Sequence, residues 1–354
     1  MAFTTINKSS EYFNTKLFTG DGATSNAITG VGFQPDFVWL KNRSAVAGHQ
    51  LSDAVRGKSG TNYYSLSSDT TAAQAVQGDN DGLNTLGSDG FTVGYTNSTG
   101  WNNSGNNYAS WNWKANGTGS SNTVGSINST VSANTTSGFS VVTFTGTGAN
   151  ATVGHGLGSV PKMIILKSYG GSTNWIVYHN SIGNGKALSL NTTAAESADA
   201  GYFNSTTPTS TVFSLGSDGF SNGSGQTMVA YCFAEKQGYS KFGSYTGNGN
   251  ADGTFVYTGF KPAFVMTKEW EGTSDWYMND TTRDFNGTYG NDASLLANTS
   301  GAEFTSASLN VDMLSNGFKL RSTNASTNEV AGYIYMVFAA APLVGSNNVP
   351  ANAR

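Results

Sequence analysis

The sequence predicts an all-β protein made of three tandem, diverged β-sandwich units of jelly-roll or lectin-like type. Composition is the first observation that predicts this fold: the 354 residues include 45 Gly, 20 Phe, 16 Tyr and 7 Trp, and only 11% are charged. Aromatic and β-branched side chains suit pleated sheets, whereas Gly, Asn and Ser suit the turns between short strands. The second observation is a set of six motifs that recurs three times in the same order, while no segment shows a helical period.

Two motifs open each copy. An aromatic residue followed by Thr-Gly-x-Gly predicts a strand that ends in a glycine turn. It stands at residues 17–22, 143–148 and 244–249. A proline followed by a mostly apolar run and a lysine predicts a central strand that is covered on both faces. This second motif stands at residues 35–41, 161–167 and 262–268.

Four further motifs complete each copy. One is an aromatic or apolar stretch with polar flanks, at residues 49–55, 175–179 and 276–279. Another is a strand that leads into a Thr-rich turn, at residues 64–72, 188–194 and 295–300. Next comes Asp-Gly or Asn-Gly between apolar residues, a strong hairpin signal, at 86–91, 215–220 and 314–318. A closing strand ends the copy, and its alternate residues predict one buried sheet face: Trp111, Trp113, Tyr231, Phe233, Met336 and Phe338.

These motifs set the predicted domain boundaries. The segments are an N-terminal attachment arm (1–16), repeat 1 (17–115), a Gly/Ser/Thr/Asn-rich linker (116–137), repeat 2 (138–235), repeat 3 (238–342) and an irregular C-terminal tail (343–354). Six motifs per repeat suffice for two packed sheets, but they leave Greek-key, jelly-roll and simpler topologies open.

Charge and hydropathy exclude several classes of protein. The net charge is −4 without a Lys/Arg cluster, so we expect no nucleic-acid partner. No apolar run approaches the ~20 residues of a membrane helix, so we expect no membrane insertion. The N-terminus does not resemble a secretory signal, which favours synthesis in a cytoplasm. The single cysteine, Cys232, lies in an apolar strand and is interpreted as a buried thiol.

Catalytic and metal-binding motifs receive little support. The three histidines, His49, His155 and His179, do not recur at the same place in the other repeats, and no nucleophile elbow is present. Glu269, Glu271 and Asp275 are interpreted as a solvated loop, and residues 79–82, which resemble part of a calcium loop, as a turn. The sequence therefore predicts a protein that is not an enzyme and that uses no cofactor and no metal.

Two binding surfaces are candidates. Trp101 lies in a loop rich in Asn, Ser and Gly, and Trp270 and Trp276 flank a polar loop, so these three tryptophans are the predicted glycan contacts. A sugar can stack on an indole while neighbouring amides bind its hydroxyls. The second surface is the N-terminal arm, whose apolar residues are predicted to attach the chain to a larger assembly: Phe3, Ile6, Tyr12 and Phe13.

Four segments together resemble a family of virion structural proteins of marine phages and cyanophages. They are residues 1–6, 32–43, 106–115 and 241–249. The resemblance covers nearly the whole chain and supplies no catalytic residues. It implies a non-catalytic exterior component of the virion, either a tail fibre or short fibre or a head-surface knob or decoration, that contributes to host attachment.

The same resemblance sets the expected partners and location. It implies assembly in the host cytoplasm and incorporation into the virion, with other virion proteins as partners. A homo-oligomer is expected, with a trimer as the form suggested by analogy, and a host surface glycan is a further candidate partner. The alternatives are a lectin-like receptor-binding protein and, less favoured, a glycan depolymerase.

Overall fold

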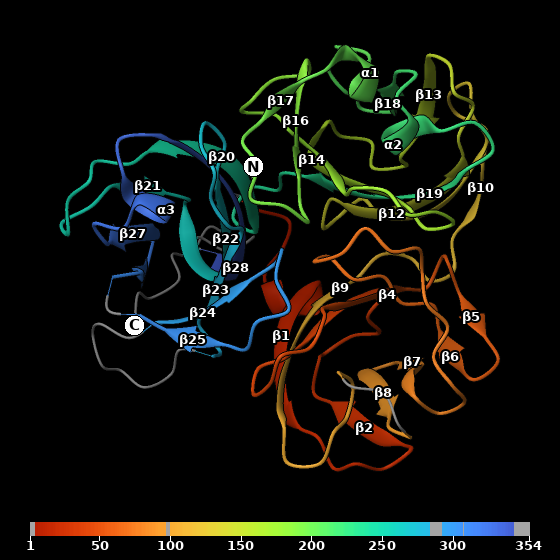
Figure 1. Ribbon diagram of the computed structural model, residues 1–354, viewed down its shortest axis with the longest axis horizontal. Coiled ribbons are helices and arrows are strands. Elements are labelled where there is room, and N and C mark those ends of the chain that lie inside the picture. The colour runs from red at the N-terminus through yellow and green to blue at the C-terminus, as the bar shows by residue number, and fades with distance from the viewer. Residues whose placement is uncertain (1–3, 97–99, 284–291, 307, 343–354) are drawn as a thin grey trace.

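The chain folds into three lobes of antiparallel β-sheet that meet at one centre (Figure 1). This computed structural model describes residues 4–96, 100–283, 292–306 and 308–342. Strands make up 46% and helices 5%, which confirms the all-β prediction. Each lobe contains one large and one small sheet, and we call the lobes units 1, 2 and 3 in chain order.

The large sheets contain most of the strands. In unit 1 the order is β1 (Phe13–Thr19), β9 (Asn107–Trp113), β3 (Phe37–Asn42) and β4 (Gln50–Asp53). In unit 2 it is β10 (Ser120–Asn122), β11 (Ser129–Asn134), β12 (Phe139–Thr145), β19 (Thr227–Ala234), β14 (Pro161–Ser168), β15 (Ile176–His179), β16 (Lys186–Ser189) and β17 (Ser197–Ala198). In unit 3 it is β20 (Ser240–Thr246), β28 (Gly332–Pro342), β22 (Phe260–Glu269), β23 (Tyr277–Asp280), β24 (Ala293–Leu296) and β25 (Phe304–Thr305).

A small sheet covers the outer face of each large sheet. The small sheets are β2 (Asn26–Thr29), β8 (Gly90–Gly94) and β7 (Gly82–Gly87) in unit 1, β13 (Ala151–Gly154) and β18 (Val212–Leu215) in unit 2, and β21 (Phe255–Tyr257), β27 (Gly317–Arg321) and β26 (Asn310–Leu314) in unit 3. The remaining elements are short: η1 (Ser9–Glu11), the hairpin β5 (Lys58–Ser59) and β6 (Asn62–Tyr63), α1 (Ala200–Phe203), α2 (Gly219–Asn222) and α3 (Ala325–Asn328). Among the described residues, no helix is long and apolar enough to cross a membrane.

The three large sheets have four strands in the same order. The opening strand pairs with the closing strand, the closing strand with the proline–lysine strand, and that strand with the next one along the chain. Side chains on a strand alternate between its two faces, so each closing strand serves two cores. On β19, for example, Val229, Tyr231 and Phe233 point to the centre of the molecule, while Ala230 and Cys232 face the small sheet of unit 2.

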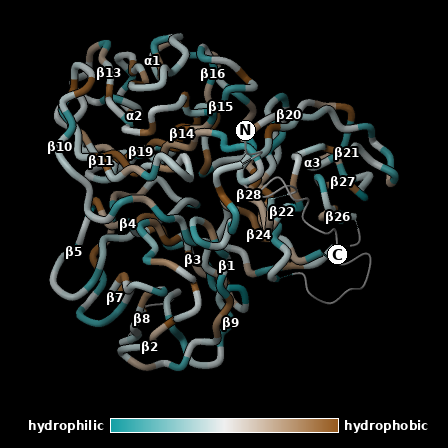
Figure 2. The backbone as a smooth tube through the Cα atoms, turned by 180° about the vertical axis from the view of Figure 1, so that it is seen from behind, coloured by the Kyte–Doolittle hydropathy of each residue, from teal (hydrophilic) through white to brown (hydrophobic). Residues whose placement is uncertain are grey.

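One central core joins the three units. Three closing-strand rings contact one another there: Trp113 and Phe233 at 6.2 Å, Phe233 and Phe338 at 6.2 Å, and Trp113 and Phe338 at 5.7 Å between centroids. The six closing-strand residues predicted to share a buried face all lie in this core, which confirms that prediction. Hydrophobic stretches follow large-sheet strands such as β14, β22 and β28, whereas outer loops are more hydrophilic (Figure 2).

The Thr-Gly-x-Gly motif forms the same turn in each unit. Its second glycine has a left-handed φ of 75°, 69° or 64°, at Gly22, Gly148 and Gly249, which favours glycine. The N–H of this glycine donates to the carbonyl of a buried asparagine in the segment before the closing strand: Asn102, Asn222 or Asn328. The asparagine side chain also hydrogen-bonds to the same turn. In each of the three units, the same set of hydrogen bonds therefore fixes the opening strand to the closing strand.

The expected linker and one of the expected hairpins differ from the structure. Residues 116–137, expected to be a linker, contain β10 and β11, which extend the large sheet of unit 2 because Ile127 and Val131 are buried. The expected hairpin is formed by β7 and β8 and by β26 and β27, but not at residues 215–220. There Asp218 accepts from the N–H of Phe220 and caps α2 instead. An Asp-Gly pair suits both a hairpin turn and a helix start, so the local signal is ambiguous.

The predicted arm also differs, because part of it belongs to unit 1. Strand β1 begins at Phe13, four residues before the expected start of the first repeat, and pairs with β9. Phe13 and Ile6 are 2% and 1% exposed and lie in the central core. The tail 343–354 lies outside the described residues.

Candidate functional site

Three buried lysines lie where the units meet. Lys41, Lys167 and Lys268, near the ends of β3, β14 and β22, have no exposed side-chain surface. Burial lowers the pKa of each lysine to about 8. No carboxylate forms an ion pair with any of the three in the part of the chain that the structure describes. Each ammonium donates instead to backbone carbonyls of its own unit, as Lys41 does to Ala47 at 2.7 Å.

Each lysine also binds the preceding unit. The units are arranged in a ring, so the unit before unit 1 is unit 3. The Thr-rich turn of one unit presents a carbonyl to the lysine of the next: Thr71 to Lys167 at 3.1 Å, Thr193 to Lys268 at 3.2 Å, and Ser300 to Lys41 at 3.0 Å. The same carbonyls accept a backbone N–H at 2.9 Å from Thr173, Ser274 and Ala47. Unit 1 therefore contacts unit 2, unit 2 contacts unit 3, and unit 3 contacts unit 1. We call these contact regions seams 1–2, 2–3 and 3–1.

A second recurring contact lies in each seam. A ring N–H on one unit meets a carbonyl of the preceding unit: Trp175 donates to Ser67 at 2.9 Å, Trp276 to Ser189 at 3.0 Å, and His49 lies 3.0 Å from Leu296. The other ring nitrogen of His49 accepts from the indole N–H of Trp39 at 2.8 Å, so His49 is neutral and protonated at Nε2. Burial, helped by the charge of Lys41, lowers the pKa of His49 to about 4.

A third contact joins each unit to the closing strand of the next. Asp53 accepts from the hydroxyl of Tyr231 at 2.8 Å, and Asp280 accepts from the indole of Trp111 at 3.0 Å. Each aspartate is paired at 2.5 Å with an arginine three residues later, Arg56 or Arg283. These buried charges are paired and hydrogen-bonded, which is the condition under which a protein interior tolerates them.

His179 takes the place of the aspartate in seam 2–3. Its Nε2 lies 3.3 Å from the carbonyl of Tyr335, and its Nδ1 accepts from the N–H of Ser181 at 3.2 Å. Burial lowers its pKa to about 4. Ile182 stands where the other two units have arginine, so the positive charge is lost together with the negative one.

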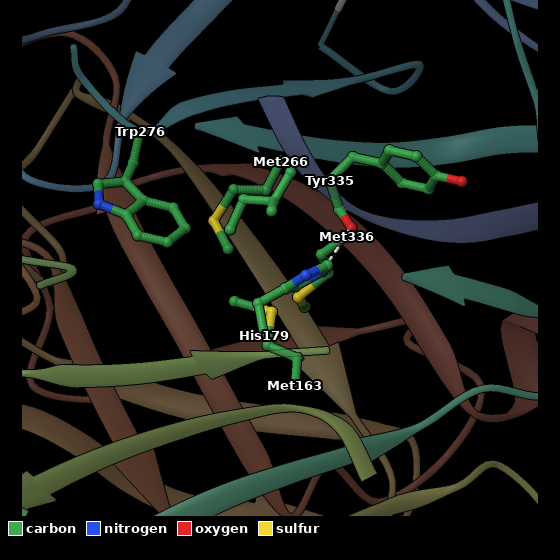
Figure 3. A pocket seen from close by; sticks show the side chains of 7 residues that line it. Met163, His179, Met266, Trp276, Tyr335 and Met336 are labelled. Atoms are coloured by element: carbon green, nitrogen blue, oxygen red, sulfur yellow. Dashed lines mark hydrogen bonds between the residues drawn. The ribbon is translucent and has the colours of Figure 1, made fainter. Parts of the chain in front are cut away.

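The seam around His179 has a small gap, shown in Figure 3. It is lined by Met163, His179, Met266, Trp276, Ile334, Tyr335 and Met336, and it is too narrow for a water molecule. Thioethers and an imidazole can both bind transition-metal ions. Both imidazole nitrogens of His179 are already engaged, however, so this arrangement is a packed interface between units.

The other candidate reactive groups, for which the sequence favoured a structural role, are buried or have hydrogen-bonding partners. His155 lies 3.1 Å from the carbonyl of Thr209 and accepts from the N–H of Leu157. Glu271 accepts from the N–H of Gly332 at 2.7 Å, and Asp275 accepts from Asn298. Burial raises the pKa of the Cys232 thiol. Among the described residues, no group of three or more His, Cys, Asp or Glu side chains could hold a metal ion.

The three predicted glycan contacts are not brought together. Trp101 is 0% exposed and lies in the outer core of unit 1, and Trp276 is 1% exposed and bonds across a seam. A sugar can stack only on an accessible ring, so burial removes the physical basis for both residues. Trp270 is half-buried against the central core, with its indole close to Gly332, and its role in glycan binding stays a prediction.

The apolar residues of the predicted arm lie against the body of the chain. Ile6 and Phe13 are buried in the central core, and Phe13 stacks on Phe338 at 4.7 Å. Tyr12 is half-buried and meets Tyr239 edge-on at 6.2 Å. Phe3 lies outside the described residues. Attachment through this segment stays a prediction, but the side chains of Ile6 and Phe13 already contact other parts of this chain.

Sequence reasoning did not find the seams. The lysine at the end of the apolar strand recurs three times, and a repeated charge at the end of a buried run is the signal that could have indicated them. Burial and the partner unit cannot be read from that pattern, because the acceptors lie 96, 75 and 259 residues away.

The fold and the seams define a class: an all-β protein in which three two-sheet units close around one core and use their buried polar groups to hold one another. The chain belongs to the DUF7483 family, described as a domain of unknown function, whose model matches residues 8–342. That single model spans all three units. No curated protein and no solved structure matches the chain.

Proposed function

We propose that this chain is a non-catalytic structural protein of a phage particle. Its place is an exterior appendage, either a tail fibre or short fibre or a head-surface knob or decoration, and it contributes to host attachment. The proposal rests on the resemblance of four sequence segments to virion proteins and on one structural observation, the cyclic closure of three units within one chain. A closed ring of hydrogen bonds from buried lysines suits a rigid body that must persist outside a cell.

We also infer that the three units are diverged copies of one β-sandwich of jelly-roll or lectin-like type. The shared strand order, the shared glycine turn and the equivalent seam contacts support this inference. The central core is completed by one chain, so a homo-oligomer, a trimer included, and contacts with other virion proteins would form through the outer surfaces of the units. The protein would be assembled in the host cytoplasm and reside in the virion.

Localisation on the intact particle tests this proposal. A tagged chain should be found on purified particles by gold labelling and by mass spectrometry, at a fixed copy number and accessible to antibody without disruption of the particle. Presence in the lysate together with absence from purified particles would refute the proposal. A depolymerase is the alternative that a second assay addresses: incubation with host surface polysaccharide should leave the polysaccharide chain length unchanged.

A further inference from the structure

The outer face of the small sheet of unit 3 differs from the corresponding faces of units 1 and 2. On β21, Val256 points into the outer core, and its neighbours Phe255 and Tyr257 point outward with 43% and 54% of their surface exposed. This sheet lies on the outer side of its lobe, away from the other two lobes, in both views (Figures 1 and 2).

The equivalent strands of units 1 and 2 can be compared with this face residue by residue. Val256 pairs with Phe318, just as Ile28 pairs with Phe91 and Val153 with Phe213, and all six residues are buried. The register therefore places Phe255 and Tyr257 at the positions of Ala27 and Thr29 in unit 1 and of Thr152 and Gly154 in unit 2. Units 1 and 2 form the same strand pair without aromatic residues at these two outward positions, so folding does not require the two rings.

Four charged residues accompany the rings in unit 3. Residues that are paired across antiparallel strands share a face, so Phe255, Lys319 and Asp312 form one row. Lys319 and Arg321 both bind Asp252, at 2.7 and 2.6 Å, and Arg321 also binds Asp312 at 2.7 Å. In unit 1 the places of Lys319, Arg321 and Asp312 are held by Thr92, Gly94 and Thr85. The four charges sum to zero.

The free edge of β21 is blocked against pairing with another strand. Lys241 donates to the carbonyl of Tyr257 at 3.0 Å and lies over the Tyr257 ring, 5.4 Å from its centroid. Lysine at a sheet edge is a common means of preventing strand addition. In unit 2 the corresponding edge is covered by the chain itself, because Ser126 donates to the carbonyl of Thr152 at 3.0 Å.

We propose that this face of unit 3 binds a neutral saccharide, with Phe255 and Tyr257 as stacking platforms and Asp252 and Arg321 as hydrogen-bonding groups for hydroxyls. Rings two residues apart on a strand are separated by roughly 7 Å, which lets them contact neighbouring sugars. The cations of this face are already engaged, Lys319 and Arg321 by carboxylates and Lys241 by the ring and carbonyl of Tyr257, which favours an uncharged ligand over a polyanion. This inference deepens the proposed function and rests on it for the biological source of the saccharide, a host surface.

Binding by the purified full-length chain tests the inference. The probes are immobilised neutral hexasaccharides with glucose, mannose, galactose or N-acetylglucosamine backbones, together with an acidic hexuronate. We expect millimolar or tighter binding to at least one neutral probe. The variant Phe255→Ala/Tyr257→Thr, which copies Ala27 and Thr29, should weaken this binding at least tenfold. Phe220→Ala removes an exposed ring of unit 2 and should leave binding unchanged.

Several results would overturn the inference. They are no binding of any neutral probe at 10 mM, equal binding by the double variant, preference for the hexuronate, or a concentration-dependent dimer that the double variant abolishes. The single variant Tyr257→Thr, expected to weaken binding severalfold, replaces the double variant if that protein does not fold. Incorporation into particles is measured separately and should be normal for both variants, so loss of the proposed function is distinguishable from loss of saccharide binding.

Discussion

At the scale of single residues, one structural position holds two kinds of side chain. It is an aspartate in units 1 and 3, Asp53 and Asp280, and a histidine in unit 2, His179. The aspartates form ion pairs with arginine, whereas His179 is buried as a neutral ring. Sequence reasoning noted that no histidine recurs at its position and therefore disfavoured catalysis. In the structure, all three histidines are hydrogen-bonded to other groups of the chain. The sequence could not reveal that a carboxylate and an imidazole perform the same task, because their residue types do not match.

Buried neutral histidines predict loss of stability in acid. The pKa values of His49 and His179 are about 4 in the folded chain, below the usual 6.5. The unfolded chain therefore takes up protons first as the pH falls below about 6.5, and the stabilisation is lost as the pH approaches 4. Each histidine accounts for roughly 3 kcal/mol of this loss. Urea unfolding at pH 7 and at pH 4.5 measures the difference.

A substitution separates this effect from the titration of carboxylates. His179→Gln keeps a donor for the Tyr335 carbonyl and removes the titrating group. We expect its free energy of unfolding to fall less steeply between pH 7 and 4.5 than that of the wild type. Identical slopes would show that His179 contributes nothing to the acid sensitivity.

At the scale of elements, the sequence predicted the strands well wherever the period or the motif was strong. The alternating residues of the closing strands and the apolar proline–lysine strands are confirmed by the structure. The Ser/Thr-rich strands β10 and β11 were missed because few apolar residues mark them. The Asp-Gly pair at 218–219 led to a wrong hairpin prediction, because helix capping and hairpin turns favour the same residues.

The lysine contacts at strand ends predict a clear cost of removal. Lys167→Met keeps much of the apolar stem but leaves the carbonyls of Ser168, Gly171 and Thr71 without this donor. Carbonyls that lose a partner in a buried or partly buried position cost stability, so we expect a loss of about 2–4 kcal/mol. Chemical denaturation measures the loss. Exposed Lys186→Met is the matched control, and an equal effect of both variants would contradict the role assigned to Lys167.

At the scale of the whole molecule, the units share one core, so they should not unfold independently. Calorimetry should show one transition with a calorimetric enthalpy equal to the van't Hoff enthalpy. Units that unfold independently, as the linker expected at residues 116–137 would allow for repeat 1, would give two or three transitions. A resolved series of transitions would show that the central core does not couple the units.

The meeting point of the three closing strands gives a sharper test of this coupling. Phe233→Ala removes a ring that contacts both Trp113 and Phe338. We expect a loss of about 3–5 kcal/mol. Hydrogen exchange should increase in β9, β19 and β28 alike. An increase confined to β19 and its sheet neighbours would contradict a shared core. Val330→Ala, at a highly exposed position, is the control.

The covalent connection of the three units has a consequence for how such a protein can change. In a ring of identical chains, every substitution is repeated at each position around the axis, so no face can vary alone. Here the outer surface of one unit can differ from those of the other two, and the difference between Phe255 and Ala27 is of this kind. A single gene can thus encode a ring whose sectors have separate tasks.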